Sequence, residues 1–306
     1  MDVNPCLLSV VIPTFRDGER ASNAVTALLR QSLPDGMERE IIVVDDGSDD
    51  DTAGHLSKCI GAQVRILRLP FNQGRSAARN AGAAIAAGEF VVFMDCDCAP
   101  KAGFLTAHLT ALNSGAAAST GHVAGEGEGF WNRYQSEAST RRQHQHEMGM
   151  PYVGSSQNLA VRRSAFTAVG GFDTSYRRYG FEDRDLLVRV AKLGRVAWAS
   201  QAIVHHQDRI TLSQVSAKMT EAGEHSSTQF AQQHPDAYVR LGYAAIDTRI
   251  HPIMKIFAPT YIPIASLLAT GFDYLRGERW LPYFLARRLV KIVAALSYSG
   301  GTARGR

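Results

Sequence analysis

The chain of 306 residues is 45% hydrophobic and 20% charged, and it carries a formal net charge of +4. This composition is that of an ordinary globular protein and excludes a disordered chain. The length predicts one large domain, or one domain with an appendage. Proteins that bind nucleic acid usually carry a clustered basic face. The mild charge therefore leads us to expect no nucleic-acid partner.

The cysteines and the start of the chain bear on the cellular compartment. Cys6, Cys59, Cys96 and Cys98 show no paired framework, which fits a reducing compartment better than a disulfide scaffold. Residues 1–8 have neither the basic segment nor the long apolar run of a signal peptide. We therefore expect a cytoplasmic protein.

Short apolar runs alternate with helical patterns over the first 95 residues. Strands are predicted at 7–13, 40–44, 64–69 and 89–94, and helices at 19–30, within 51–59 and at 74–87. This alternation indicates βαβ units, a mostly parallel sheet and right-handed crossovers. Ligands bind such sheets beyond the carboxyl ends of the strands. Polar clusters fall at those ends, at 13–17, 45–48 and 95–97.

The second half of the sequence is less regular. Residues 125–149 are polar and are expected to form a mobile loop with some helix. A strand is predicted at 158–162, a helix at 181–193, and a strand at 195–204 that runs into a histidine pair. We expect the α/β domain to cover residues 1–209 and a helical region to cover residues 210–306.

The helical region contains two segments with different patterns. The apolar stretch 252–270 is interrupted by a lysine and two prolines, and a spanning helix needs about 20 mostly apolar residues, so we expect it not to cross a membrane. Residues 280–297 form a basic amphipathic helix, with Leu281, Leu285, Leu289, Ile292 and Leu296 on one face. Such a helix can lie on a membrane surface, pack on the core, or contact a second copy of the chain in a homo-oligomer.

Two carboxylates follow the fourth predicted strand. Asp95 and Asp97 could reach one Mg²⁺ or Mn²⁺ together, or one could hold a ribose while the other binds metal. An isolated Asp-x-Asp is more often a solvated turn, but its place after a strand of this series favours the metal interpretation. His205 and His206 end the last predicted strand, and a neutral imidazole there could complete the site or be structural.

Two further clusters are candidates for binding an anionic nucleotide. Asp45 and Asp46 end the second strand, where a carboxylate could accept from a base or a ribose, or cap the following helix. Gly74, Arg75 and Arg79 open the third helix, whose N-terminus suits an anion. The alternative for these arginines is an ordinary surface helix with solvated side chains.

A carboxylate pair begins the predicted helix 181–193. Glu182 and Asp183 stand in its first turn, where a carboxylate can act as general base toward an acceptor hydroxyl. The alternative is compensation of the helix dipole.

Taken together, these segments resemble the family 2 glycosyltransferases of the GT-A fold. The matching pieces are SVVIPTFRD (9–17), IIVVDDGSDDDT (41–52), NQGRSAARNAG (72–82), FVVFMDCDC (90–98), GGFD (170–173) and GFEDRDLLVRV (180–190), and they cover roughly residues 7–206. The resemblance implies a Rossmann-like, mostly parallel α/β sheet flanked by helices, with a C-terminal helical appendage. Residues 1–98 would bind the nucleotide-sugar and residues 99–209 the acceptor.

The resemblance also implies a role for each matched residue. The residues implied to bind the nucleotide-sugar donor are Pro13, Thr14, Phe15, Asp45, Asp46, Gly74, Arg75, Arg79 and Asp95. Of these, Pro13, Thr14, Phe15 and Asp45 would contact the base, and Asp95 would contact the ribose. Asp97 and His205 would bind Mn²⁺ or Mg²⁺, with His206 as the neighbouring alternative. Asp183 would be the general base, and Glu182 would contact the acceptor.

The implied activity is that of an inverting, metal-dependent hexosyltransferase. It would move a sugar from a nucleotide diphosphate donor, a UDP-sugar by family habit, to a saccharide or lipid-linked acceptor in cell-envelope or polysaccharide synthesis. The C-terminal region could then contact the cytoplasmic face of the membrane.

Two other functions remain open. A sugar nucleotidyltransferase would want a glycine-rich phosphate loop after the first strand, where this chain has Pro13, Thr14 and Phe15. A non-catalytic membrane-surface protein would carry a degenerate transferase domain, against which the intact acidic set argues.

Overall fold

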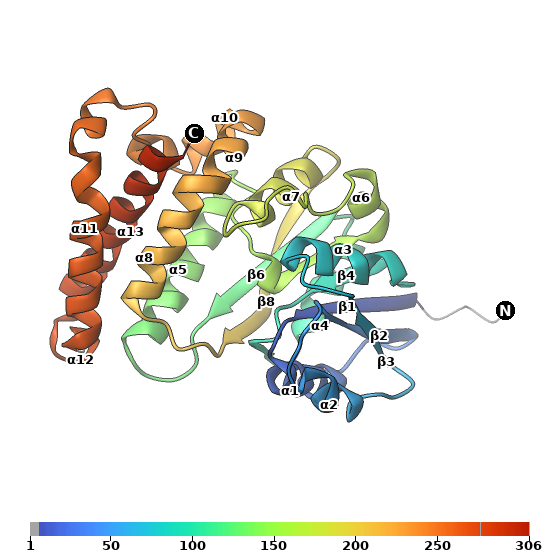
Figure 1. The fold of residues 1–306 in the computed structure, drawn as a ribbon. Helices are drawn as coiled ribbons and strands as arrows, with labels where there is room; N and C mark the ends of the chain where they lie inside the picture. Colours follow the sequence, from blue (N-terminus) through green and yellow to red (C-terminus); the bar gives the residue numbers. More distant parts are fainter. Residues whose placement is uncertain (1–5, 276, 306) are drawn as a thin grey trace. The chain divides into compact units, whose positions relative to one another are not determined.

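The structure, a computed structural model, describes residues 6–275 and 277–305 (Figure 1). The chain packs as two compact units. The first consists of the described residues up to Glu126 with Ser136–Thr174 and Leu186–Gln207, and the second of Gly127–Gln135, Ser175–Asp185 and the described residues from Asp208 onward.

The first unit is built on an eight-stranded sheet with the order β3-β2-β1-β4-β7-β6-β8-β5. Its strands are β1 (Cys6–Thr14), β2 (Met37–Asp45), β3 (Val64–Arg68), β4 (Phe90–Phe93), β5 (Cys98–Pro100), β6 (Ala118–Ala124), β7 (Leu159–Arg162) and β8 (Val196–His206). Strands β1 to β4 are parallel neighbours, β7 is antiparallel to β4 and β6, β8 is parallel to β6, and β5 is antiparallel to β8. The predicted mostly parallel sheet is confirmed.

Helices connect these strands. They are α1 (Gly18–Leu29), α2 (Thr52–Ser57), α3 (Arg75–Ile85), α4 (Phe104–Asn113) and α6 (Arg163–Ala168), with a 3₁₀ turn at Ser156–Asn158. The first three were predicted from the sequence, whereas α4 and α6 were not. Strands β1 and β4 and the second half of β2 are nearly continuous apolar runs, because both faces of a parallel sheet are covered. Val10, Ile12, Ile41 and Val92 are all fully buried.

Gly82 explains why α3 lies close to the sheet. A Cβ atom at this position would meet Val11 Cγ1 at 2.5 Å and Val44 Cγ2 at 2.9 Å. The missing side chain therefore lets α3 approach β1 and β2 directly, which fixes where the first residues of α3 stand relative to the ends of these strands.

The polar segment 125–149 contains far more helix than the sequence suggested. Helix α5 (Phe130–Glu147) is 18 residues long. Gly127 and Gly129 have positive φ angles just before it, and the helix itself contains no glycine or proline. Its glutamines, glutamates and arginines are good helix formers, but they form no apolar stripe, which is the pattern that reveals a helix.

His108 of α4 is a fully buried polar side chain in the first unit. Its Nδ1 lies 2.8 Å from Ser119 Oγ, and its Nε2 lies 2.8 Å from Asn158 Oδ1. Burial lowers the pKa of His108 to about 4, although the hydrogen bond with Asn158 acts in the opposite direction. The imidazole is therefore neutral in the folded protein at neutral pH.

We expect His108 to make the protein sensitive to mild acid. Because its pKa is lower in the folded than in the unfolded chain, its contribution to stability is complete above pH 6.5 and is lost as the pH falls toward 4. The loss is at most about 3 kcal/mol. Urea unfolding across this range should show a smaller loss for His108→Gln than for the native chain. The exposed His144→Gln should behave like the native chain, and an unchanged profile for His108→Gln would contradict the assignment.

The second unit is helical. Its elements are α8 (Leu212–Glu221), the π-helix η2 (Ala222–Ser226), α9 (Ser227–Gln233), α10 (Pro235–Arg240), the 3₁₀ helix η3 (Tyr243–Ile246), α11 (Pro252–Tyr274), α12 (Gly277–Trp280) and α13 (Tyr283–Arg304). Helices α8, α11 and α13 lie side by side (Figure 1). Phe130, Leu212, Ala265, Phe272 and Val290 belong to their shared core.

The apolar face predicted for residues 280–297 is only partly buried, with Leu281, Leu289 and Leu296 packed against the core of the second unit. Leu285 and Ile292 are 41% and 51% exposed, while the fully buried positions include small residues such as Ala286 and Ser297. The reason is close packing between helices: a Cβ atom on Gly301 would meet the carbonyl oxygen of Thr220 at 2.2 Å. Small side chains therefore occupy the most buried positions of α13, and larger ones such as Leu285 and Ile292 remain exposed.

Helix α11 is long and apolar enough to cross a membrane, judged by length and composition. Only 11% of its most apolar window is buried in the protein. The expectation that this segment does not span a membrane stays a prediction.

Candidate active site

At the carboxyl ends of β1 and β2 lie the first residues that were predicted to bind the nucleotide-sugar donor. The sheet register pairs Thr14 with Asp45, and the backbone N–H of Asp46 donates to the carbonyl of Thr14 at 2.9 Å. Pro13 and Thr14 are buried, whereas Phe15 is 39% exposed. Phe15 is thus the member of this group that offers its side chain to solvent or to a ligand.

Asp45 has a structural task at this edge. Its Oδ1 accepts from the backbone N–H of Ser48 at 2.9 Å, and its Oδ2 lies 3.5 Å from Arg68 Nε. The carboxylate thus closes the turn at residues 45–48, but it does not cap α2, whose N-cap is Asp51. A role toward a nucleotide base stays a prediction.

Asp46 holds the loop before α3. Its two carboxylate oxygens accept from the backbone N–H groups of Gln73 and Gly74, each at 2.8 Å. Burial raises the pKa of Asp46, the two backbone hydrogen bonds lower it, and the result lies above the usual value. Gly74, with a φ of +93°, can adopt this turn because it lacks a Cβ. Asp46 therefore shapes the N-terminus of α3, where Arg75 is exposed.

Arg79 forms a buried ion pair with Asp95. Its Nη2 donates to Asp95 Oδ1 at 2.6 Å, and the two side chains are 1% and 13% exposed. The guanidinium also lies 5.4 Å from the centre of the Phe172 ring. Burial raises the pKa of Asp95, but the charges of Arg79 and Arg75 and the hydrogen bond outweigh it and hold the pKa below its usual value. For Arg79 the alternative of a solvated surface arginine is wrong.

Arg79→Met should lower the free energy of unfolding by about 3–5 kcal/mol, because it leaves the Asp95 carboxylate buried and without its cation. Denaturant unfolding measures this effect. The exposed Arg30→Met is the matched control and should change little. Adding Asp95→Asn to Arg79→Met should recover part of the loss, so a double variant no more stable than Arg79→Met would argue against the pair.

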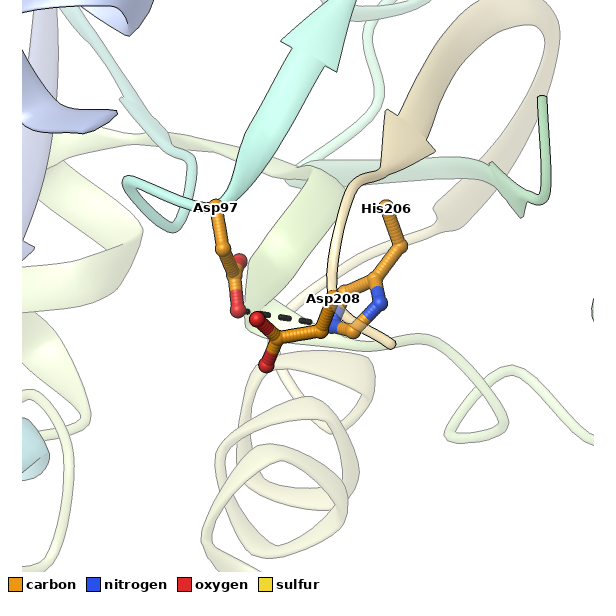
Figure 2. A group of neighbouring side chains, drawn as sticks. All are labelled: Asp97, His206 and Asp208. Atoms are coloured by element: carbon orange, nitrogen blue, oxygen red, sulfur yellow. Dashed lines mark ion pairs between the residues drawn. The ribbon is translucent and has the colours of Figure 1, made fainter. Parts of the chain in front are cut away.

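A group of three side chains forms a possible cation site (Figure 2). Asp97, His206 and Asp208 each offer a ligand atom, and these atoms lie within 4.8 Å of one another. Asp97 Oδ2 is 3.4 Å from His206 Nε2. The pairing of β5 with β8 sets this geometry, because it places His206 opposite Cys98, and the N–H of Gln207 donates to the carbonyl of Asp97 at 2.9 Å.

The ligand atoms of these three residues fit a small divalent cation. Two carboxylates and one imidazole suit Mn²⁺ or Mg²⁺ when phosphate oxygens supply further ligands. Burial raises the pKa of the Cys96 and Cys98 thiols, and the nearby Asp97 raises it further. Neutral thiols are poor ligands, so a thiolate site is disfavoured. This agrees with the packing of both cysteines in or against the core.

The structure brings His206, and not His205, to Asp97. Successive residues of a strand point to opposite faces, so only one of the two histidines can face the carboxylate. Neither ring nitrogen of His205 has a hydrogen-bond partner within the described residues, and both are buried.

Sequence reasoning missed Asp208 altogether. It stands two residues after His206, and the spacing His-x-Asp after a strand end was the available signal. Side chains two residues apart in an extended segment share one face.

Glu182 and Asp183 lie in the second unit, at the start of α7 (Glu182–Ala191). The residue before them, Phe181, has a φ of +71°. Its ring stacks on Phe230 at 4.8 Å and meets Tyr243 at the same distance. An aromatic cluster therefore fixes the entry into the helix.

A second contact holds the same turn. Asp185 Oδ1 lies 2.8 Å from His234 Nε2, and both side chains are buried. The backbone N–H of Asp185 also donates to the carbonyl of Phe181 at 2.8 Å. The first turn of α7 is thus anchored on both sides of Glu182, which is buried, and Asp183, which is half-buried. The His234 partner was not predicted, because it lies 49 residues away in the sequence.

Residues 9–181 match the protein family described as "Glycosyl transferase family 2". The chain belongs to this family. The matched range runs from the first buried strand to the residue that precedes Glu182, so it includes the donor candidates and both carboxylates after β4.

Two curated relatives in the family illustrate the range of similarity. A "Pre-mycofactocin glycosyltransferase" of Mycobacterium tuberculosis is 31% identical over 245 residues, which are 75% of this chain and 48% of that protein. A "GalNAc(5)-diNAcBac-PP-undecaprenol beta-1,3-glucosyltransferase" of Campylobacter jejuni is 34% identical over 125 residues, 40% of each chain. The chain thus spans about half the length, or less, of these two relatives.

A solved structure of similar fold is the mannosyltransferase PcManGT from Pyrobaculum calidifontis in complex with GDP-Man and Mn²⁺. It superposes with a TM-score of 0.62 at 19% identity and covers 96% of this chain and 86% of its own. At this identity the likeness concerns the fold, and the GT-A type of fold expected for a family 2 member is confirmed.

Proposed function

We propose that this protein is a nucleotide-sugar-dependent glycosyltransferase that transfers a sugar with inversion. One observation carries the proposal. In this family 2 chain both carboxylates that follow β4 are held in place, Asp95 by an ion pair with Arg79 and Asp97 beside His206. A degenerate transferase domain would not need two buried or half-buried carboxylates held in this way.

In the proposed donor site the residues at the strand ends bind and orient the nucleotide. Phe15 offers an exposed ring to the base, next to the turn closed by Asp45. Arg79 holds one oxygen of Asp95, which orients the other toward a ribose hydroxyl. The N-terminus of α3, shaped by Asp46 and carrying the exposed Arg75, supplies positive potential for a diphosphate.

Asp97, His206 and Asp208 are the proposed ligands of Mn²⁺ or Mg²⁺. When bound, the cation would neutralise charge on the leaving diphosphate. The family resemblance assigned this role to Asp97 and His205; the 3.4 Å separation from Asp97 favours His206 in place of His205.

Asp183 is the proposed general base. It would take the proton from an acceptor hydroxyl while that oxygen bonds to the anomeric carbon and the bond to the diphosphate breaks. Glu182 would contact the acceptor. Because the first turn of α7 is anchored through Phe181 and Asp185, these carboxylates need little reorganisation before the reaction.

The acceptor is proposed to be a saccharide or a lipid-linked saccharide of cell-envelope or polysaccharide synthesis. The support is that the Campylobacter relative is named for an undecaprenol-linked substrate. We also propose a cytoplasmic location, supported by the free thiols of Cys59, Cys96 and Cys98. Recovery of the native protein from a periplasmic or secreted fraction would contradict this location.

A panel of nucleotide-sugars with Mn²⁺ tests the proposed function. One donor should raise the melting temperature of the protein and release nucleoside diphosphate when an acceptor is present. The resemblance to other family members makes a UDP-sugar the expected donor. Release of pyrophosphate from a nucleoside triphosphate would instead identify a sugar nucleotidyltransferase. No stabilisation by any nucleotide-sugar would favour a non-catalytic protein.

A further inference from the structure

Helix α11 presents an apolar stripe to solvent, interrupted by the exposed Thr260. Ile253, Ile256, Phe257, Ile264 and Leu267 are between 44% and 74% exposed. Tyr274, the last residue of the helix, and Leu275, directly after it, are 85% and 58% exposed. At about 100° per residue these seven side chains fall within an arc of about 100° on the helix surface. The stripe therefore runs the full length of the helix on one face.

The opposite face of α11 is packed in the second unit. Ala265 and Ala269 are almost fully buried, Phe272 is 5% exposed, and all three belong to the core shared with α8 and α13. The helix is therefore an integral part of this unit, and a soluble protein would be expected to present polar side chains on the outer face.

The neighbouring helices add apolar anchors. Trp280 of α12 is 60% exposed and donates its indole N–H to the carbonyl of Leu275. Phe284 is 59% exposed, and Leu285 and Ile292 of α13 are also outside the core. Aromatic side chains of this kind are enriched where protein meets the lipid–water interface.

Basic residues accompany these apolar side chains. Residues 252–306 contain eight Lys or Arg and two Asp or Glu. Arg279, Arg288 and Lys291 are exposed, and the last two alternate with Phe284 and Ile292 on the outer face of α13. One of the two acidic residues, Asp273, is engaged in accepting from the backbone N–H groups of Leu212 and Ser213. The surface thus combines apolar side chains with the exposed basic residues Arg279, Arg288 and Lys291.

We propose that this surface, made of the stripe on α11 and the exposed side chains of α12 and α13, docks on the surface of an anionic phospholipid bilayer. The helices lie in the interface, with apolar side chains among the acyl chains and basic ones at the headgroups. A second copy of this chain is a poorer occupant, because two such basic surfaces would repel each other. A spanning α11 would have to give up its packing on α8 and α13.

Vesicle co-sedimentation of the full chain tests the proposal without reference to sugar transfer. The protein should bind vesicles of phosphatidylcholine mixed with phosphatidylglycerol, more weakly at high salt, and bind phosphatidylcholine alone much less. The Ile256→Glu/Leu267→Glu variant should lose binding by more than about tenfold. Ile60→Glu and Leu193→Glu replace apolar residues in the first unit that are 68% and 55% exposed, and as matched controls they should bind normally.

The contribution of the basic residues to vesicle binding is tested by separate substitutions. Arg288→Gln and Lys291→Gln should each weaken binding to anionic vesicles about fivefold, whereas Lys58→Gln, an exposed lysine of the first unit, should not. Circular dichroism and melting temperature verify that each variant is folded.

Several results would overturn the proposal. Native protein that does not bind anionic vesicles, or an Ile256→Glu/Leu267→Glu variant that binds like the native chain, would exclude lipid docking. Bound protein that resists alkaline carbonate extraction would indicate a spanning helix. A native dimer that this variant dissociates, with unchanged lipid binding, would assign the surface to a second copy.

Discussion

Replacing Asp183 by asparagine is expected to lower the turnover of sugar transfer by about 10²–10⁴-fold while leaving the affinity for the donor unchanged. Asparagine keeps the size and much of the hydrogen bonding of the side chain, but it cannot accept the proton of the acceptor hydroxyl. Single-turnover transfer, with donor binding measured separately by calorimetry, separates the two effects.

Asp236→Asn is the matched control for this experiment. Asp236 is also an acidic residue in the first turn of a helix, α10, and is exposed. If the carboxylate of Asp183 served only the helix dipole, both substitutions would change stability by about 0.3–1 kcal/mol and leave turnover intact. Near-native turnover of Asp183→Asn would therefore remove the general-base assignment.

Asp97→Ala should lower the affinity for Mn²⁺ by more than about 100-fold and weaken Mn²⁺-dependent donor binding with it. Loss of a residue that only supports a ligand costs roughly 10–100-fold in metal affinity, and loss of a ligand should exceed this. Titration with Mn²⁺, followed by electron paramagnetic resonance, measures the affinity without donor or turnover.

The two adjacent histidines give this prediction an internal control. His206→Ala should weaken Mn²⁺ binding, because His206 Nε2 lies 3.4 Å from Asp97 Oδ2, and His205→Ala should spare it. The reverse result would restore His205 as the ligand, as the family resemblance implied. Equal Mn²⁺ affinity for native protein and Asp97→Ala would contradict the cation site altogether.

The donor half of the fold was predictable from the sequence because its signals are local. Strands β1 and β4 and the second half of β2 are apolar runs that end in polar clusters, and the helices between them have their own periodicity. The ends of parallel strands meet at one sheet edge. The order of strands and polar clusters along the chain is therefore enough to place Thr14, Asp45 and Asp95 near that edge.

The rest of the site depends on contacts that no local pattern encodes. The choice between His205 and His206 is set by the register of β8 on β5, a strand of three residues with no signal of its own. The use of Asp46 to hold the loop before α3 depends on a contact across 28 residues. Of the five apolar residues expected on one face of residues 280–297, Leu281, Leu289 and Leu296 pack against the core of the second unit. Leu285 and Ile292 are exposed, because close helix packing selects small side chains at the most buried positions of α13.

The pairing of β5 with β8 also bears on the order in which the molecule can be completed during synthesis. Strands β1 to β4 are joined by short crossovers, so their contacts become available as the first third of the chain emerges. Asp97 and His206 are separated by about a hundred residues, and contacts of such long range form late because closing the loop between them is costly. A nascent chain thus carries Asp97 long before His206 and Asp208, and the proposed cation site can assemble only after β8 has been made.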